Sequence, residues 1–209
     1  MAKYKKGKSM SCNRFRKIKK TNRCFDHIDE LILANSKSED EKYDSIIAHY
    51  KATHSERDKH LADIKNAAKI ENAIVLAATA RDGEGRKHGH QNLIPPSDLQ
   101  QFSDSILMRK DDIVAADSFG QLYNIIKESK VGGVGDLCIY DTAHRLGHYL
   151  GLSPDVIYLH RGTKEGATKL IGKIKEAYIS KDMLPVPFQR EDLSNSEIED
   201  ILCIYKKHF

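Results

Sequence analysis

Apolar residues recur at intervals of three and four along much of the chain, which is the spacing of one buried face of an α-helix. The segment Ser38-Glu39-Asp40-Glu41 predicts a helix start, because a serine side chain accepts from a first-turn amide and acids suit that end. This helix is expected to bury Tyr43, Ile46, Ile47 and Tyr50. A shorter helix, capped by Asp26 and carrying the apolar residues of 28–33, is expected before it.

A second capping pattern, at residues 55–58, precedes an alanine-rich segment that continues to about Ala80. We predict one long helix here, whose small side chains allow neighbouring helices to pack closely. Residues 81–90 contain three glycines and no apolar residue, which indicates a surface loop. Pro95-Pro96-Ser97 then predicts the start of a helix that runs to about Leu107.

Two segments of clear helical period flank a glycine-rich turn. The first carries Phe119, Leu122, Tyr123, Ile125 and Ile126, and the second carries Leu137, Ile139, Tyr140, Ala143, Leu146 and Leu150. Gly151 is the expected C-cap of the second helix. Thr163 is predicted to cap a helix through Ile179, and Ser194 or Ser196 to cap the last one. Residues 156–159 form the only β-like run, which is too short to imply a sheet.

These elements predict an all-α protein: one compact, multi-helix domain over residues 25–209, with a hairpin at residues 130–136. A chain of 209 residues can bury a sizeable core. From their composition, residues 1–24 are expected to form a basic and flexible N-terminal extension. No apolar run approaches the ~20 residues of a membrane span, and the N-terminus lacks the apolar segment of a secretory signal. We therefore expect a cytoplasmic protein without membrane contact.

Charge is distributed unevenly along the chain, whose formal net charge is +4. Residues 1–23 hold ten Lys and Arg and no acid, whereas the remainder has 24 bases against 30 acids, a balance of −6. A basic arm of this kind binds nucleic acid by releasing counterions, and it is equally typical of a solvated tail that aids solubility.

The cysteine pattern argues against a metal cluster. Four cysteines are scattered without a Cys-x-x-Cys pair, so a reducing compartment without disulfides is the simplest interpretation. His88-x-His90 has chelating spacing but no third ligand that the sequence fixes, and we expect no metal and no cofactor.

The candidate chemistry centres on Lys130-Val131-Gly132-Gly133-Val134-Gly135-Asp136, between the two periodic helices. Glycines allow a tight turn and the close approach of a ligand, and the next helix offers unpaired amides to an anion. Over about residues 126–143 the segment resembles a helix-hairpin-helix motif, with which many DNA-repair and DNA-processing proteins grip a phosphate backbone. The resemblance implies phosphate contact by the turn glycines, with Val134 buried to pin the hairpin. Asp136 departs from the often basic or neutral position of the family, and its carboxylate could cap the following helix itself.

A distant resemblance to the helix-hairpin-helix DNA glycosylases extends to about residue 155. Those enzymes place a catalytic aspartate in the loop after the second hairpin helix, where Asp155 falls here. An aspartate there stabilises a cationic sugar or activates a nucleophile. Asp155 fits a turn or cap in Ser153-Pro154-Asp155 equally well, and the chain has no four-cysteine cluster.

A second polar segment follows at residues 159–166. A helix that starts at Thr163 would direct its first amides outward beside Arg161 and Lys164, which is a suitable arrangement for phosphate. An ordinary capped helix explains the same residues. The expected nucleic-acid contacts are therefore Lys130, Gly132, Gly133, Val134, Gly135, Arg161, Thr163 and Lys164.

Taken together, these residues favour a non-catalytic, nucleic-acid-associated or adaptor protein, with DNA or RNA as partner. Walker, nucleophile-elbow and kinase signatures are absent from the sequence. Two alternatives stay open: a divergent DNA glycosylase or lyase that uses Asp155, and a structural or protein-interaction domain whose glycines only shape the fold.

Overall fold

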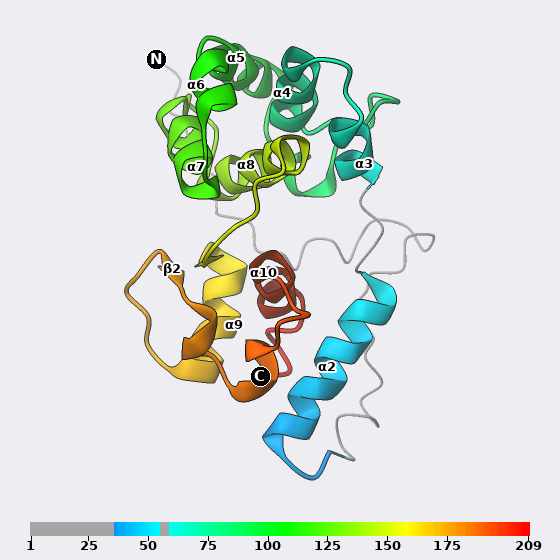
Figure 1. The fold of residues 1–209 in the computed structure, drawn as a ribbon, viewed down its shortest axis with the longest axis vertical. Coiled ribbons are helices and arrows are strands. Elements are labelled where there is room, and N and C mark those ends of the chain that lie inside the picture. The colour runs from blue at the N-terminus through cyan, green and yellow to red at the C-terminus, as the bar shows by residue number, and fades with distance from the viewer. Residues whose placement is uncertain (1–35, 55–58) are drawn as a thin grey trace, which may run out of the picture.

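The computed structural model describes residues 36–54 and 59–209, and this part of the chain is mostly helical (Figure 1). The helices are α2 (Glu39–Thr53), α3 (Lys59–Lys65), α4 (Ile70–Thr79), α5 (Pro96–Leu107), α6 (Lys110–Ala115), α7 (Phe119–Glu128), α8 (Asp136–Leu150), α9 (Arg161–Ile171) and α10 (Asn195–Ile204). Short 3-10 turns are η2 (Gly89–Gln91), η3 (Lys181–Met183) and η4 (Val186–Gln189). The all-α prediction is confirmed.

Two strands of two residues each accompany the helices. β1 (Ile157–Tyr158) pairs with β2 (Tyr178–Ile179) in antiparallel orientation, so that Tyr158 lies opposite Tyr178. The basic extension, the expected helix at 28–33 and the capping pattern at 55–58 lie outside the described residues.

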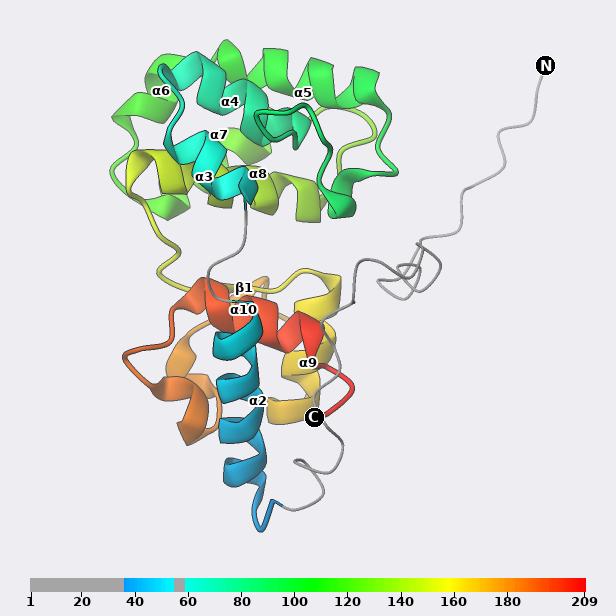
Figure 2. The same cartoon turned by 90° about the vertical axis from the view of Figure 1, so that its right-hand side faces the viewer.

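The helices form two units that lie end to end along the long axis of the molecule (Figures 1 and 2). The α3–α8 unit comprises residues 59–150, and its buried apolar side chains form one cluster. The α2/α9–α10 unit comprises residues 36–54 and 151–209, and its buried side chains form a second cluster. Helix α2 thus belongs to the second unit, residues 59–150 form the α3–α8 unit, and residues 151–209 complete the second unit.

Helix α8 is the central element of the α3–α8 unit, with α3, α4 and α7 packed against it. Its buried face includes a charged residue, because Arg145 is only 3% exposed. The Arg145 guanidinium donates to Gln91 Oε1 at 3.2 Å and to the Ala77 carbonyl at 3.4 Å, and it lies 3.6 Å from Asp141 Oδ2. Gln91 in turn donates to Asp141 at 2.5 Å. This buried polar group fixes the segment after residue 88 onto α8.

Helix α2 packs in the second unit against residues about 150 positions away in the sequence. Its apolar face buries Tyr43, Ile46, Ile47 and Tyr50, as the spacing predicts. Tyr50 also donates its hydroxyl to Asp200 at 2.9 Å, and His49 Nδ1 lies 2.6 Å from the Tyr205 hydroxyl. The Ser38 cap is present as predicted, since its hydroxyl accepts from the Glu41 amide at 3.1 Å.

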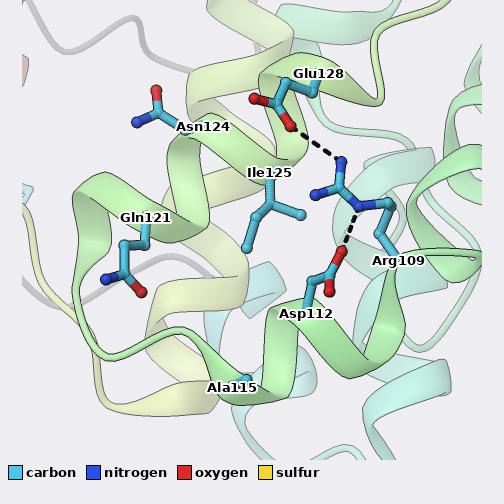
Figure 3. A pocket seen from close by; sticks show the side chains of 7 residues that line it. All are labelled: Arg109, Asp112, Ala115, Gln121, Asn124, Ile125 and Glu128. Carbon is cyan, nitrogen blue, oxygen red and sulfur yellow. Dashed lines mark hydrogen bonds and ion pairs between the residues drawn. The ribbon is translucent and has the colours of Figure 1, made fainter.

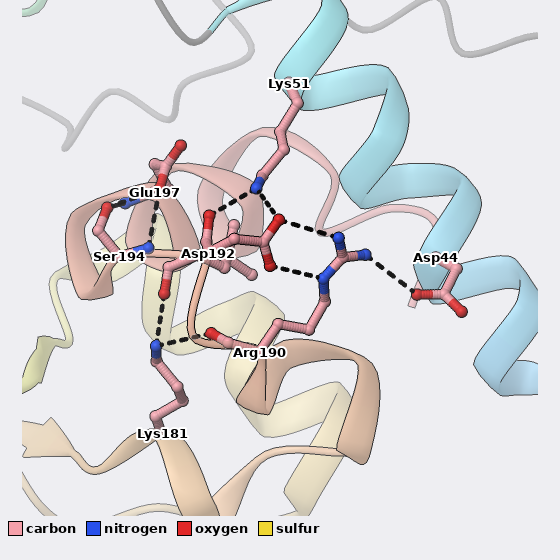
Figure 4. A network of polar contacts seen from close by, with 8 residues as sticks. Asp44, Lys51, Lys181, Arg190, Asp192, Ser194 and Glu197 are labelled. Atoms are coloured by element: carbon pink, nitrogen blue, oxygen red, sulfur yellow. Dashed lines mark hydrogen bonds and ion pairs between the residues drawn. The ribbon is translucent and has the colours of Figure 1, made fainter.

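An exposed ionic network adds to this attachment of α2 (Figure 4). Asp192 accepts from Arg190 at 2.9 Å and from Lys51 of α2 at 2.5 Å, and Arg190 lies 3.6 Å from Asp44 of α2. The hydrogen bonds from Arg190 and Lys51 hold the pKa of Asp192 well below its usual range. The network ends beside Ser194, which forms a capping box with Glu197 at the start of α10.

Two predicted helices are wrong in their extent, and one predicted absence of a sheet is also wrong. The long helix to Ala80 is two helices, because Lys69 is extended, with φ −142°, and α4 turns back so that both helices reach α8. The last predicted turns of α9 do not form: the helix ends at Ile171, Gly172 adopts φ +84°, and the chain returns as β2. The run at residues 156–159 therefore does form a strand, since β2 supplies its partner. Helix α6 was not predicted.

Candidate nucleic-acid interface

The turn between α7 and α8 has one buried residue among exposed glycines. Val134 is 3% exposed, whereas Gly132, Gly133 and Gly135 are exposed. Gly133 has φ +82°, a conformation that favours glycine, while Gly135 has φ −98°. Open space surrounds the Cα hydrogens of Gly132 and Gly135, where an added Cβ would have no heavy atom within 4 Å. The turn is thus pinned at Val134 and open at its glycines.

The start of α8 differs from the expected cap. Gly135 is the N-cap and brings no side-chain acceptor, so the cap that Asp136 could have provided does not form. Asp136 is the first helical residue, its side chain is 82% exposed, and its carboxylate lies 3.6 Å from Lys130 Nζ. The N-cap residue therefore offers no side-chain acceptor to the first amides of α8.

Two carboxylates and two lysines set the charge at this turn. Asp98, in the first turn of α5, lies against Gly133, where a Cβ would come within 2.2 Å of its Oδ2. Lys130 pairs with Asp136, and Lys127 is exposed on the last turn of α7. The immediate charge at the turn is therefore balanced rather than positive.

The second predicted group of residues lies in the other unit and is arranged differently. Helix α9 begins at Arg161, two residues before the predicted cap, and Thr163 is fully buried. The Thr163 hydroxyl donates to Glu199 Oε1 at 2.5 Å, and that oxygen also lies 3.0 Å from His160 Nε2. Thr163 is therefore a core hydrogen-bond donor rather than a cap that meets phosphate, because burial separates it from solvent.

The two basic residues of that group are at the surface. Arg161 is exposed, and Lys164 is half-buried, with its Nζ donating to the Glu176 carbonyl at 3.1 Å. The structure thus brings Lys130, Gly132, Gly133, Val134 and Gly135 together in one turn and keeps Arg161 and Lys164 in the other unit.

Asp155 is exposed in the segment that joins the two units. The turn at 130–135 precedes the 15-residue helix α8, and Asp155 follows it in the chain. Within the described residues, no group of three or more His, Cys, Asp or Glu has the geometry of a metal site.

The predicted loop at 81–90 contains a well-organised turn. Asp82 is 3% exposed, and its carboxylate accepts from the Glu84 and Arg86 amides at 3.0 and 2.8 Å and from Arg86 Nε at 2.8 Å. Burial raises the pKa of Asp82, but the Arg86 side chain and these amides outweigh it and lower the pKa to about 2. An aspartate before Gly-x-Gly was the sequence signal for this turn.

A surface hollow of about 410 Å³ lies between α6 and α7 (Figure 3). Its one cation, Arg109, donates to Asp112 at 2.5 Å and to Glu128 at 3.1 Å. Gln121, Asn124 and Ile125 complete most of the lining. Because Arg109 is paired with the carboxylates of both Asp112 and Glu128, the hollow lacks the net positive charge that a phosphate site needs.

Comparison with known proteins returns no family model that matches the chain, and no curated protein or solved structure that is similar to it. None of the helices in the described ranges combines the length and apolar character required to cross a bilayer.

Proposed function

We propose that this protein is a non-catalytic, nucleic-acid-associated protein that contacts the phosphate backbone at the α7–α8 turn. The observation that carries the proposal is the exposure of Gly132, Gly133 and Gly135 around the buried Val134. Exposed glycines allow a phosphate to approach the main chain, and the α8 amides beyond Gly135 provide donors along a favourable dipole. Backbone contacts of this kind position nucleic acid without reading its sequence.

The neighbouring charges define how strong this contact is expected to be. Lys127 and Lys130 favour an anion, whereas Asp98 and Asp136 oppose it. The turn alone should therefore bind weakly, and the basic residues 1–23 should supply much of the affinity by counterion release. No feature of the exposed Asp155 favours the glycosylase alternative.

The test is a titration of the full chain with duplex DNA, single-stranded DNA and RNA across a salt series. Asp136→Lys should strengthen binding and steepen the slope of log K against log salt by about 1 or more, because it replaces a repelling charge by a phosphate contact. Gly135→Glu should weaken binding, because it places a carboxylate at the open side of the turn.

Gly120→Glu is the matched control, because Gly120 also has open space around it and lies at the other end of α7. Deletion of residues 1–23 should flatten the salt slope. Equal affinities for wild type, Asp136→Lys and Gly135→Glu would contradict a phosphate contact at the turn. Wild type that binds none of the three nucleic acids would leave the protein-interaction alternative.

A further inference from the structure

A row of tyrosine rings crosses the junction between the two units. Tyr123 of α7 lies 4.7 Å from Tyr158 of β1, measured between ring centroids, and Tyr158 lies 6.2 Å from Tyr178 of β2. The order follows from the sheet register, which places Tyr158 opposite Tyr178 and so directs both rings to one face. Exposure increases along the row: Tyr123 and Tyr158 are half-buried, and Tyr178 is 55% exposed.

Basic side chains lie at both ends of this tyrosine row. At the α7 end, Lys127 Nζ lies 6.0 Å from the centroid of the Tyr123 ring, one turn before the exposed glycines. At the β2 end, Lys164 Nζ contacts the carbonyls of Lys175 and Glu176, which lie three and two residues before the strand. Lys175 itself is exposed. An exposed aromatic side chain beside basic residues, as at Tyr178, is a combination with which proteins hold single strands.

We propose that the tyrosine row is a stacking surface for single-stranded nucleic acid, with an unpaired base on Tyr178 and the strand continuing past Tyr158 toward Lys127 and the α7–α8 turn. This inference rests on the proposed function and names its substrate class. Single-stranded bases are free to stack on an aromatic side chain, whereas duplex bases are already stacked on one another.

The remaining charges near the row are consistent with a modest affinity. Burial, followed by the nearby Asp155 carboxylate, raises the pKa of Tyr158 to about 12, so its ring is uncharged at neutral pH. Asp136 lies near Tyr123 and Glu176 precedes Tyr178, so acids interrupt the basic ends. Affinity must then come from stacking, which makes the aromatic substitutions the decisive ones.

The chain contains no tryptophan, and this allows a direct test. Tyr178→Trp preserves an aromatic face and places a single tryptophan at the proposed site, which can be excited selectively over the tyrosines of the chain. Titration of this full-length variant with a thymidine oligonucleotide should quench its fluorescence. Met183→Trp is the matched control, because Met183 is 50% exposed in the same unit but outside the row, and its fluorescence should not change.

Affinity measurements complete the experiment. Tyr178→Ala should weaken single-strand binding about tenfold, while Tyr178→Phe should retain it. Thermal melting at the wild-type temperature would show that Tyr178→Ala is folded. Wild type should also bind the single strand more tightly than a duplex of equal length.

The outcomes separate this inference from the proposed function. Unchanged affinity in Tyr178→Ala, or binding without quenching in Tyr178→Trp, would overturn the stacking surface and leave phosphate contact at the turn intact. Quenching by a proline-rich peptide and not by oligonucleotide would overturn it in favour of a protein partner. Absence of all nucleic-acid binding by wild type would overturn both.

Discussion

The two units differ in how far apart their contacting residues lie in the sequence. In the α3–α8 unit, successive helices pack within one continuous stretch of 92 residues, from Lys59 to Leu150. In the α2/α9–α10 unit, Tyr50 reaches Asp200 and His49 reaches Tyr205, 150 and 156 residues later. Local contacts require less loop closure, so the first unit is expected to form faster than the second.

The buried polar groups of the two units also differ in how far apart in the sequence the segments that they join lie. Arg145 joins α8 to Gln91 and to the end of α4 within one unit. In the other unit, the Thr163–Glu199 and Tyr50–Asp200 hydrogen bonds join segments that the chain brings together only at its end. Satisfied buried networks favour one packing over its alternatives, and here they specify which distant segments meet.

The largest expected loss in the free energy of unfolding comes from a substitution of Arg145 in the α3–α8 unit. Arg145→Met keeps an unbranched side chain of similar length but leaves the Asp141 carboxylate without its buried cation. We expect a loss of about 4 kcal/mol in the free energy of unfolding, measured by urea denaturation, because one partner of a buried pair is removed. The double variant Arg145→Met/Asp141→Leu should recover part of the loss. A loss below about 1 kcal/mol in the single variant would show that Arg145 is not a central element of the unit.

The second-largest loss in the free energy of unfolding is expected from Gly166→Ala, which should affect the α2/α9–α10 unit more than the α3–α8 unit. A Cβ on Gly166 would lie 2.1 Å from the Leu202 carbonyl oxygen and 3.1 Å from its Cα, so Gly166→Ala must separate α9 from α10. We expect a loss of about 3 kcal/mol. Hydrogen exchange should show faster exchange in α2, α9 and α10, with protection retained in α4, α5 and α8. Gly120→Ala, where space is open, is the control. Equal loss of protection in both units would contradict their separation into two structural regions.

The smallest expected effect is the pH dependence of stability that arises from Asp82. The pKa of Asp82 is about 2 in the folded protein, below the value of about 3.9 for an unfolded aspartate. Its contribution to stability is therefore complete above the unfolded value and is lost as the pH falls toward 2. Amide resonances of Glu84 and Arg86, which donate to this carboxylate, should shift over that range by NMR. The same resonances should not titrate in Asp82→Asn, and a transition near pH 4 in wild type would contradict the lowered pKa.

Helices with local capping signals could be predicted from the sequence. Ser38 and Ser194 mark the true starts of α2 and α10, and Gly151, with φ +74°, ends α8 as expected. The break between α3 and α4 could not be predicted in the same way, because the apolar pattern continues through it. What turns the chain at Lys69 is the packing of both helices on α8, a tertiary contact.

In the candidate site, too, features set by local sequence could be predicted, whereas features set by tertiary contacts could not. The burial of Val134 between exposed glycines follows from local sequence. The burial of Thr163 does not, because its partner Glu199 comes from a helix 36 residues later, and neither does the position of Asp98 against Gly133. The tyrosine row depends on the register of two short strands, which only the fold brings together.

The interrupted α2/α9–α10 unit has a consequence during synthesis on the ribosome. Helix α2 emerges with Ile46 and Ile47 on an apolar face whose partners in α10 are still untranslated. At about 5–20 residues per second, the intervening 150 residues take on the order of ten seconds to make. During that interval the α3–α8 unit can fold around its own cluster of buried residues, while α2 has no α10 to pack against. The apolar face of α2 therefore lacks its native partners on the nascent chain until the C-terminal segment has been synthesised.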